Sequence, residues 1–370
     1  MALQRTLVEP ADPAAASPPL GLSVVVDLAP AGMIVELTTV TDDSATFHLR
    51  DADGRVVVDH LDGLEPDSEL TRHGITARTL PRPPGPLRCR IGTVNDVHFG
   101  ELEAGRIDDH RDGPIVTVAP GADPYPETMN RAAVAEMAAA SLDRVIVKGD
   151  LTSAAEPSEF AAFEATYRSA FDGRLDVVRG NHDAIDGRTA YSGDRWIELP
   201  GVAVALLDTV IPDAPSGTIT AAQLDWLDAG AAAATVPVLA MGHHQQWVGG
   251  TRNPDYFGID PDASEALSVV LARRPTIVAY TAGHTHRHRV RRVAGGVPSI
   301  EVGCVKDFPG TWAEYRVYDD AILQIVRRLS SPEALAWSES CRGLYSDFGM
   351  NYAEYSMGRL GDRCFLIPAR

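Results

Sequence analysis

The chain has 370 residues, of which 45% are hydrophobic and 23% are charged, and its formal net charge is −18 at pH 7. This length exceeds what one small domain needs and accommodates two domains with a sizeable core. A surface this acidic repels phosphate backbones, so the composition argues against general nucleic-acid binding.

The N-terminal stretch lacks the features of a targeting or membrane segment. Residues 1–28 are rich in Ala and Pro, with no basic region followed by an apolar core, and no apolar run in the chain approaches ~18 residues. We therefore expect a flexible leader at residues 1–28 of a soluble, cytoplasmic protein without membrane insertion.

The cysteines do not form a recognisable framework. They are Cys89, Cys304, Cys341 and Cys364. Their wide spacing without a CxxC pair is typical of neither a disulfide scaffold nor a zinc cluster. Buried free thiols are the favoured interpretation, and a bridge between Cys341 and Cys364 is the alternative. Lys148 and Lys306 are the only lysines in the chain, and we attach no functional weight to this usage.

Short β-strands are predicted between residues 29 and 80, where apolar and β-branched residues alternate with polar ones. They are expected at residues 34–40, 45–50 and 55–59 and from Leu70 onward. The Leu-x-x-Leu-x-Pro sequence of residues 61–66 resembles the corner of a fibronectin type III sandwich, with Leu70 where that family usually has Tyr. The resemblance implies a small all-β sandwich domain at residues 29–80.

A stiff linker follows, because four of the six residues from Pro81 to Pro86 are proline. We place a domain boundary at residues 81–87. Beyond it, apolar runs of strand length alternate with helical stretches, which is typical of a layered α/β domain with a mostly parallel inner sheet. Strands are expected at residues 89–94, 145–147, 177–178, 202–207, 236–241 and 277–280, and helices at 127–141, 157–170, 221–232 and 264–272.

The last third of the chain departs from this alternation. Residues 289–305 and 312–328 predict consecutive strands in meander order, so the sheet should be mixed. Residues 331–370 are expected to form an irregular aromatic tail that packs on the domain of residues 88–330, over a sheet edge or a pocket.

Polar side chains that suit metals recur at the ends of the apolar runs. The five motifs are Asp96-Val97-His98, Gly149-Asp150, Gly180-Asn181-His182-Asp183, Gly242-His243-His244 and Gly283-His284-Thr285-His286. Carboxylate, carboxamide and imidazole groups suit Mn, Fe, Zn or Co. Alternate residues of an extended segment point the same way, so both ligands of Asp-x-His or His-x-His can face one centre. Each motif alone is ordinary turn or surface chemistry, but five in succession predict a metal centre.

This order of motifs resembles the calcineurin-like metallophosphoesterase superfamily, with D-x-H, G-D, G-N-H-[DE], G-H and G-H-x-H over residues 88–330. The resemblance implies an α/β fold, a four-layer double β-sandwich flanked by helices, that holds two divalent or mixed-valence transition metal ions (Mn, Fe, Zn or Co). It assigns Asp96, His98 and His286 to the first metal, Asn181, His243 and His284 to the second, and Asp150 to both. It also implies that His182 acts on the substrate phosphate or leaving group and that Asp183 orients His182.

Departures from related patterns narrow the resemblance. Purple acid phosphatases, which carry a fibronectin-like N-terminal domain, have Tyr where Ser153 stands and lack the His that stands here as His98. The combination of Asp-x-His with Asn-His-Asp is more similar to bacterial class III phosphodiesterases, which act on cyclic nucleotides or glycerophosphodiesters. Those enzymes often read His-His-Pro at the fourth motif, whereas Gln245 follows His243 and His244 here.

Three further residues are candidates for substrate binding. His244 is expected to face the substrate beside the ligand His243, and Arg287 to assist phosphate binding. Trp247 could stack on a base or only pack. An acidic insert at residues 108–112 is expected to be a solvated loop.

The function that these observations predict is dinuclear metal-dependent hydrolysis of a small phosphodiester, by in-line attack of a metal-bridging hydroxide. The alternatives are a phosphomonoesterase of the same fold or a non-catalytic binding scaffold. Because all eight ligand and catalytic positions are filled, the scaffold is disfavoured. The expected partner is a small phosphorylated substrate, and a homodimer is possible.

Overall fold

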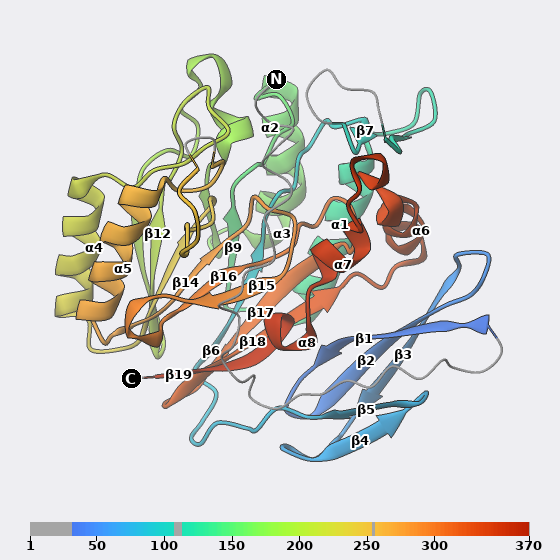
Figure 1. The fold of residues 1–370 in the computed structure, drawn as a ribbon, viewed down its shortest axis with the longest axis horizontal. Helices are drawn as coiled ribbons and strands as arrows, with labels where there is room; N and C mark the ends of the chain where they lie inside the picture. The colour runs from blue at the N-terminus through green and yellow to red at the C-terminus, as the bar shows by residue number, and fades with distance from the viewer. Residues whose placement is uncertain (1–31, 107–112, 254–255, 370) are drawn as a thin grey trace.

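The computed structural model describes residues 32–106, 113–253 and 256–369 (Figure 1). The predicted leader at residues 1–28 and the acidic insert at residues 108–112 lie outside the described residues. Two six-stranded β-sheets form the centre of the molecule. No helix within the described ranges is long and apolar enough to cross a membrane.

The first sheet combines parallel and antiparallel strands. Its strands, in spatial order, are β10 (Leu175–Val178), β9 (Arg144–Lys148), β6 (Cys89–Val94), β17 (Thr311–Val317), β18 (Ala321–Arg328) and β19 (Cys364–Pro368). β10, β9 and β6 run parallel, whereas β17 is antiparallel to β6. The parallel strands are short Val- and Ile-rich runs, as expected for strands covered on both faces.

The second sheet has a parallel centre and antiparallel edges. Its strands are β11 (Arg195–Leu199), β12 (Val202–Leu207), β13 (Val238–Gly242), β14 (Ile277–Ala282), β16 (Pro298–Glu301) and β15 (Arg289–Arg292). β12, β13, β14 and β16 are parallel to one another. The predicted strands at residues 202–207, 236–241 and 277–280 agree with β12, β13 and β14 to within two residues, whereas β11 was not predicted.

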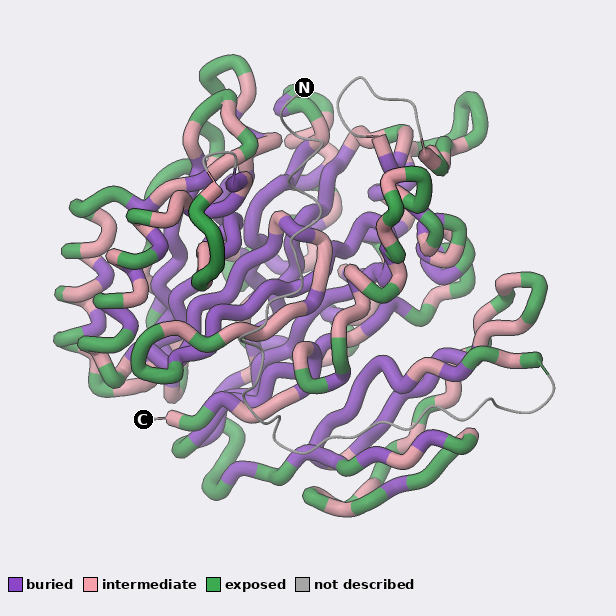
Figure 2. The backbone as a smooth tube through the Cα atoms, viewed as in Figure 1, coloured by how far each residue is buried: buried purple, intermediate pink, exposed green. Residues whose placement is uncertain are grey.

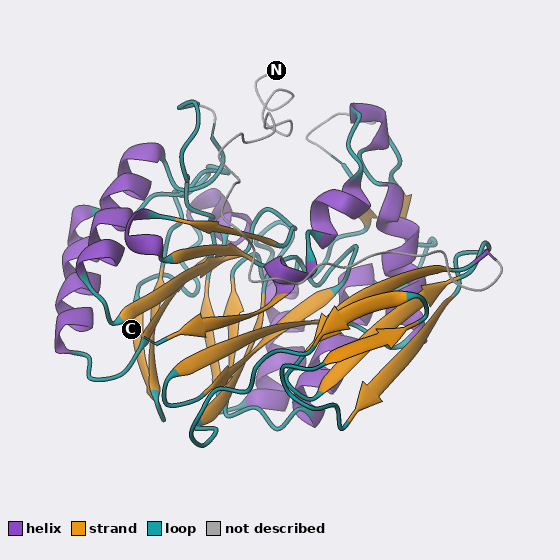
Figure 3. Cartoon of the chain, turned by 60° about the horizontal axis from the view of Figure 1, so that its bottom comes forward, coloured by secondary structure: helices purple, strands orange, loops and turns teal. Residues whose placement is uncertain are grey.

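The two sheets pack face to face, and helices cover their outer faces (Figure 3). Between the sheets, Ile91 and Ile146 of the first share a buried cluster with Val204 and Leu239 of the second. Helices α1 (Tyr125–Ala139) and α2 (Pro157–Phe163) pack on the first sheet, and α4 (Ala221–Ala233) and α5 (Pro261–Arg273) pack on the second. Buried backbone runs through both sheets, whereas the outer helices alternate between buried and exposed turns (Figure 2). The mixed α/β prediction is confirmed.

The predicted meander is confirmed within each pair of consecutive strands and wrong between the two pairs. β15 pairs with β16 in the second sheet, and β17 pairs with β18 in the first, so the chain crosses from one sheet to the other after β16. Strand pairing depends on which neighbour offers a matching apolar face, and the order of strands along the chain does not fix it.

The C-terminal segment is more regular than expected. It forms α6 (Pro332–Ser340), α7 (Tyr352–Met357), α8 (Leu360–Arg363) and β19. β19 pairs with β18 and so covers an edge of the first sheet, which was one of the two predicted positions for this segment. Covering the edge satisfies backbone groups of β18 that would otherwise be unpaired.

The N-terminal residues are all β, in agreement with part of the prediction. They form the antiparallel strands β1 (Ile34–Val40), β2 (Ser44–Arg50) and β3 (Val56–Asp62), and the hairpin of β4 (Glu69–Arg72) and β5 (Ile75–Arg78). Phe47 and Ile75 from this region share one core with Leu323 and Ile325 of β18. The N-terminal sheet therefore packs on the first sheet over a common core, and a separate domain at residues 29–80 stays a prediction. All four cysteines are free and buried, as favoured from the sequence.

A buried histidine makes the N-terminal core sensitive to acid. His48 of β2 is inaccessible, and its Nδ1 lies 2.8 Å from Thr38 Oγ1. Burial, together with the charge of Arg328, lowers the pKa of His48 from 6.5 to about 3. The unfolded chain therefore binds the proton first, and stability falls as the pH drops below 6.5 toward 3.

We expect the His48→Gln variant to lose less stability than the wild type between pH 7 and pH 5, by about 2 kcal/mol. Urea unfolding at the two pH values measures this difference. His60→Gln, at an exposed position of β3, is the control for the loss of a histidine elsewhere in the N-terminal sheet. An unchanged pH dependence in the His48 variant would contradict the assignment.

Candidate metal centre

The five predicted motifs meet at one edge of the two sheets. β6, β9 and β10 are parallel neighbours, so Asp96, Asp150 and Asn181 leave the first sheet on the same side. β13 and β14 are parallel neighbours in the second sheet and deliver His243 and His284. Since the sheets pack face to face, the strand ends of both open onto a shared space.

Backbone strain is concentrated in this region. Five candidate ligands adopt left-handed conformations, at φ values of 54° for Asp96, 48° for His98, 49° for Asp150, 67° for His284 and 54° for His286. For residues with a side chain this conformation costs on the order of 1 kcal/mol or more each. Such strain persists only where the surrounding structure imposes it, and it gathers at functional sites.

Asp150 lies between two groups of candidate ligands. Its Oδ2 is 3.3 Å from Nε2 of His98 and 3.3 Å from Nε2 of His243, and its Oδ1 accepts a hydrogen bond from the backbone of His182. Although burial opposes the charge, the imidazoles of His243 and His182 hold the pKa of Asp150 well below its usual range. One carboxylate therefore faces both groups in its charged form.

Glycines allow the close approach of these strand ends. A Cβ at Gly180 would lie 2.2 Å from Asp150 Oδ1, and a Cβ at Gly149 would lie 2.4 Å from His243 Nδ1. Neither distance leaves room for a methyl group, so the site requires glycine at both positions.

The first group consists of Asp96, His98 and His286, whose possible ligand atoms lie within 4.8 Å of one another. The outer nitrogen of each ring faces a carboxylate: His98 Nδ1 is 3.5 Å from Glu101, and His286 Nδ1 is 3.4 Å from Asp307. A carboxylate on one ring nitrogen directs the other nitrogen, with its lone pair, toward the centre.

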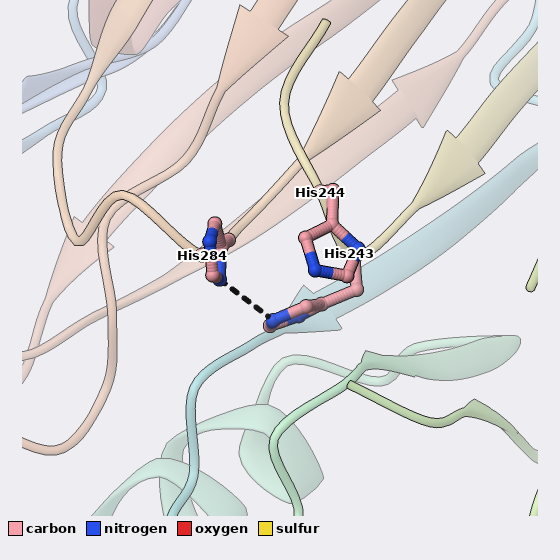
Figure 4. Close-up of side chains that lie close together, drawn as sticks. All are labelled: His243, His244 and His284. Atoms are coloured by element: carbon pink, nitrogen blue, oxygen red, sulfur yellow. Dashed lines mark hydrogen bonds between the residues drawn. The ribbon is translucent and has the colours of Figure 1, made fainter. Parts of the chain in front are cut away.

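The second group is built from acceptor atoms that face one another. His243 Nε2 lies 3.2 Å from both His284 Nδ1 and Asn181 Oδ1, and Figure 4 shows the two imidazoles turned toward each other. The remaining ring nitrogens donate to carbonyls, His243 to Lys148 at 2.9 Å and His284 to Phe257 at 3.0 Å. The nitrogens that face inward therefore carry lone pairs, and two lone pairs repel each other at this distance unless a proton or a metal ion lies between them.

The electrostatics of this group also favour a cation. Burial opposes the charged form of His243, yet the carboxylate of Asp150 raises the pKa of His243 to about 9. Asp96 acts in the same direction. Burial and the charge of His243 lower the pKa of His284 to about 3, so the pair holds one positive charge and not two. A field that holds one buried imidazolium attracts one metal ion in the same way, so the second group fits a predicted cation.

His182 is held beside the two groups by a partner that the sequence did not predict. Its Nδ1 donates to the carbonyl oxygen of Ser153 at 2.8 Å, and its ring centroid lies 4.6 Å from that of His98. His182 and Asn181 line a cavity of about 230 Å³ together with Ile185, Asp213, Ala214 and Pro215. Since Nδ1 is engaged with Ser153, Nε2 is the ring nitrogen that remains, and one possible ligand atom of His182 lies within 4.8 Å of those of His98 and Asp150.

The predicted role of Asp183 as the partner of the His182 ring is not what the structure shows. Its carboxylate accepts hydrogen bonds from the backbone of Gly180, Leu151 and Thr152 and from the Thr152 hydroxyl. Burial and the charge of Asp150 raise the pKa of Asp183 to about 6. Asp183 therefore stabilises the turn that carries Asn181 and His182.

The three candidate substrate residues lie in different surroundings. His244 is fully buried, with Nδ1 2.8 Å from Thr209 Oγ1, and it belongs with His243 and His284 to a third set of close donor atoms. Arg287 is directed to Glu301, at 2.7 Å. The ring of Trp247 packs under Arg252. Of the three, only His244 lies among the candidate metal ligands.

Several neighbours of the ligands were missed from the sequence. Lys306 pairs with Glu101 at 2.5 Å, and Asp307 faces His286. Lys148 is also buried beneath the site, where its Nζ donates to Thr281 and Ala282. Both lysines of the chain therefore lie next to the candidate ligands, although we attached no functional weight to their usage from the sequence.

A family model for calcineurin-like phosphoesterases matches residues 89–288. The chain belongs to the calcineurin-like phosphoesterase family. The matched residues contain every candidate ligand, which agrees with the superfamily predicted from the motifs. The fibronectin type III likeness of residues 29–80 stays a prediction.

Individual proteins resemble parts of the chain. A probable cyclic nucleotide phosphodiesterase of Synechococcus sp. is 27% identical over 153 residues, which make up 40% of this chain and 59% of that relative. The match therefore spans less than two thirds of the length of the relative. A dimetal phosphatase from Danio rerio has a similar fold, with a TM-score of 0.50 and 16% identity over 66% of this chain and 98% of the other. A purple acid phosphatase from yellow lupin aligns with a TM-score of 0.42 and 12% identity over 84% of this chain and 61% of the other.

We expect Gly180→Ala to weaken Mn²⁺ binding by roughly tenfold or more, because the added methyl group would displace the carboxylate of Asp150. Calorimetric titration of the purified protein with Mn²⁺ measures the affinity. Gly361→Ala is the matched control, since a Cβ there meets nothing within 4 Å. Unchanged Mn²⁺ affinity in a folded Gly180→Ala protein would contradict the role of this close approach.

Proposed function

We propose that this phosphoesterase hydrolyses a small phosphodiester with the help of two bound transition metal ions. The observation that carries the proposal is the position of Asp150 Oδ2, at 3.3 Å from a nitrogen of each ligand group. In this proposal the first ion is held by Asp96, His98 and His286, the second by Asn181, His243 and His284, and both by Asp150. When bound, such ions supply an activated water and neutralise the charge on the phosphoryl oxygens.

His182 is the proposed proton donor to the leaving group. The Ser153 carbonyl fixes the proton on Nδ1, and His182 is one of the residues that line the cavity. A general acid at this position would protonate the departing oxygen. Asn181, adjacent in the chain, borders the same cavity, so the leaving group and the second ligand group are brought together.

Charge favours a diester over a monoester. The six residues described around the cavity include no Arg or Lys, and Asp213 contributes a carboxylate. A monoester carries up to two negative charges near neutral pH and gains more from added cationic side chains than a singly charged diester does. The named phosphodiesterase among the relatives supports the same choice.

We expect the Mn²⁺-loaded protein to hydrolyse bis(p-nitrophenyl) phosphate with a higher kcat/KM than p-nitrophenyl phosphate. Removal of metal with EDTA should abolish turnover, and Mn²⁺ should restore it, because the proposed nucleophile depends on the ions. Release of p-nitrophenol measures both reactions. A preference for the monoester would reassign the protein as a phosphomonoesterase, and no turnover of either ester with two ions bound would support a binding scaffold.

Asp150→Asn should lower kcat/KM for the diester on the order of 100-fold or more, since the amide loses the charge that faces both ligand groups. Asp262→Asn on the exposed face of α5 is the matched control and should leave turnover unchanged.

His182→Asn should lower turnover by about 100-fold or more for a 3′,5′-cyclic nucleotide, whose leaving group is an alkoxide that requires a proton. The loss should be much smaller for bis(p-nitrophenyl) phosphate, since p-nitrophenolate departs without protonation. Comparison of kcat for the two substrates, at equal metal content, measures the difference. Equal losses for both would rule out a proton-donor role for His182.

A further inference from the structure

The His286 ring is the least enclosed part of the first ligand group. Its side chain is 18% exposed, whereas Asp96 is inaccessible and His98 is 5% exposed. His286 Nε2 lies 3.7 Å from Asp96 Oδ1, and its Nδ1 lies 3.4 Å from Asp307 Oδ2. The orientation of this ring therefore depends strongly on Asp307.

Asp307 is in turn fixed by groups that occupy its other oxygen. Tyr352 donates its hydroxyl hydrogen to Asp307 Oδ1 at 2.7 Å, and the thiol of Cys304 donates to the same oxygen at 3.0 Å. The carboxylate is almost inaccessible to solvent. With Oδ1 engaged in this way, Oδ2 faces His286.

Tyr352 is positioned by the packing of the C-terminal segment. It is the first residue of α7, is 2% exposed and belongs to a buried cluster with Phe308, Cys341 and Leu344. The ring of Tyr345 meets the Tyr352 ring edge-on, with centroids 5.0 Å apart. The hydroxyl therefore cannot move without disturbing a packed cluster.

We propose that Tyr352 is a positioning residue that acts through Asp307 on His286, so that the C-terminal segment completes the first ligand group. This inference rests on the proposed two-metal function. A carboxylate that is itself hydrogen-bonded holds a ligating imidazole in one tautomer and raises its basicity. Tyr352 and Asp307, which the hydrogen bond joins, are 45 positions apart in the chain.

The test uses variants of the full chain in which one ligand group is impaired, with and without a second substitution. In His284→Ala the second group is impaired, and Mn²⁺ binding reports on the first. In His98→Ala the first group is impaired, and binding reports on the second. Adding Tyr352→Phe should weaken Mn²⁺ binding roughly tenfold in the His284→Ala background and leave it unchanged in the His98→Ala background. Titration calorimetry measures the affinities, and thermal unfolding checks that each variant is folded.

Tyr315→Phe is the matched control, because it removes another buried tyrosine hydroxyl, which lies 3.1 Å from Thr281 Oγ1. It should not change Mn²⁺ affinity in either background. Asp307→Asn should reproduce the selective loss at the first group if Tyr352→Phe proves too mild to resolve.

The outcomes separate this inference from the proposed function. Equal losses of Mn²⁺ affinity in the His284→Ala and His98→Ala backgrounds would overturn the positioning role while the two-metal proposal stands. So would unchanged Mn²⁺ affinity in the His284→Ala background for both Tyr352→Phe and Asp307→Asn. A wild-type protein that binds no Mn²⁺ would overturn the proposed function itself.

Discussion

The structure depends on the burial of negative charge where the two sheets meet. Asp96, Asp150, Asp183 and Asp307 are each almost inaccessible, and an ionised carboxylate without partners costs several kcal/mol to bury. Backbone N–H groups compensate Asp183, while the other three aspartates face imidazoles. An imidazole compensates a carboxylate fully only when it carries a proton or holds a metal. The fold therefore brings together buried carboxylates whose negative charge a bound cation would neutralise.

The same requirement accounts for the strained backbone. Left-handed turns at five candidate ligands and glycines without space for a Cβ bring the strand ends closer than relaxed turns would allow. Each strained residue disfavours the folded state. The three buried clusters between and outside the sheets supply the opposing free energy, because they fix both ends of every strand that enters the site. The packing of the sheets thus stabilises a backbone conformation that the ligand residues would not adopt on their own.

The sequence was informative wherever the relevant interaction is local. β6, β10 and β12 were predicted at or very near their observed ends, since short apolar runs between polar turns identify them, and the ligand motifs follow directly. The partner of the His182 ring was not predictable, because a backbone carbonyl such as that of Ser153 leaves no side-chain pattern in the sequence. Asp307 and Tyr352 were missed because their contact joins distant segments. β19 was missed because a five-residue run beside aromatic residues does not distinguish a strand from a packed loop.

The C-terminal segment connects regions that the sequence suggested were independent. Arg342 binds Glu36 of β1 through two hydrogen bonds of 2.7 and 2.9 Å, and Arg363 donates to two β1 carbonyls. β19 completes the first sheet, and Tyr352 reaches Asp307 beside the ligands. The N-terminal sheet consequently supports the segment that fixes a ligand partner. Because charge pairs that are partly buried are costly to break, this support links the stability of the N-terminal core to the geometry of the candidate metal centre.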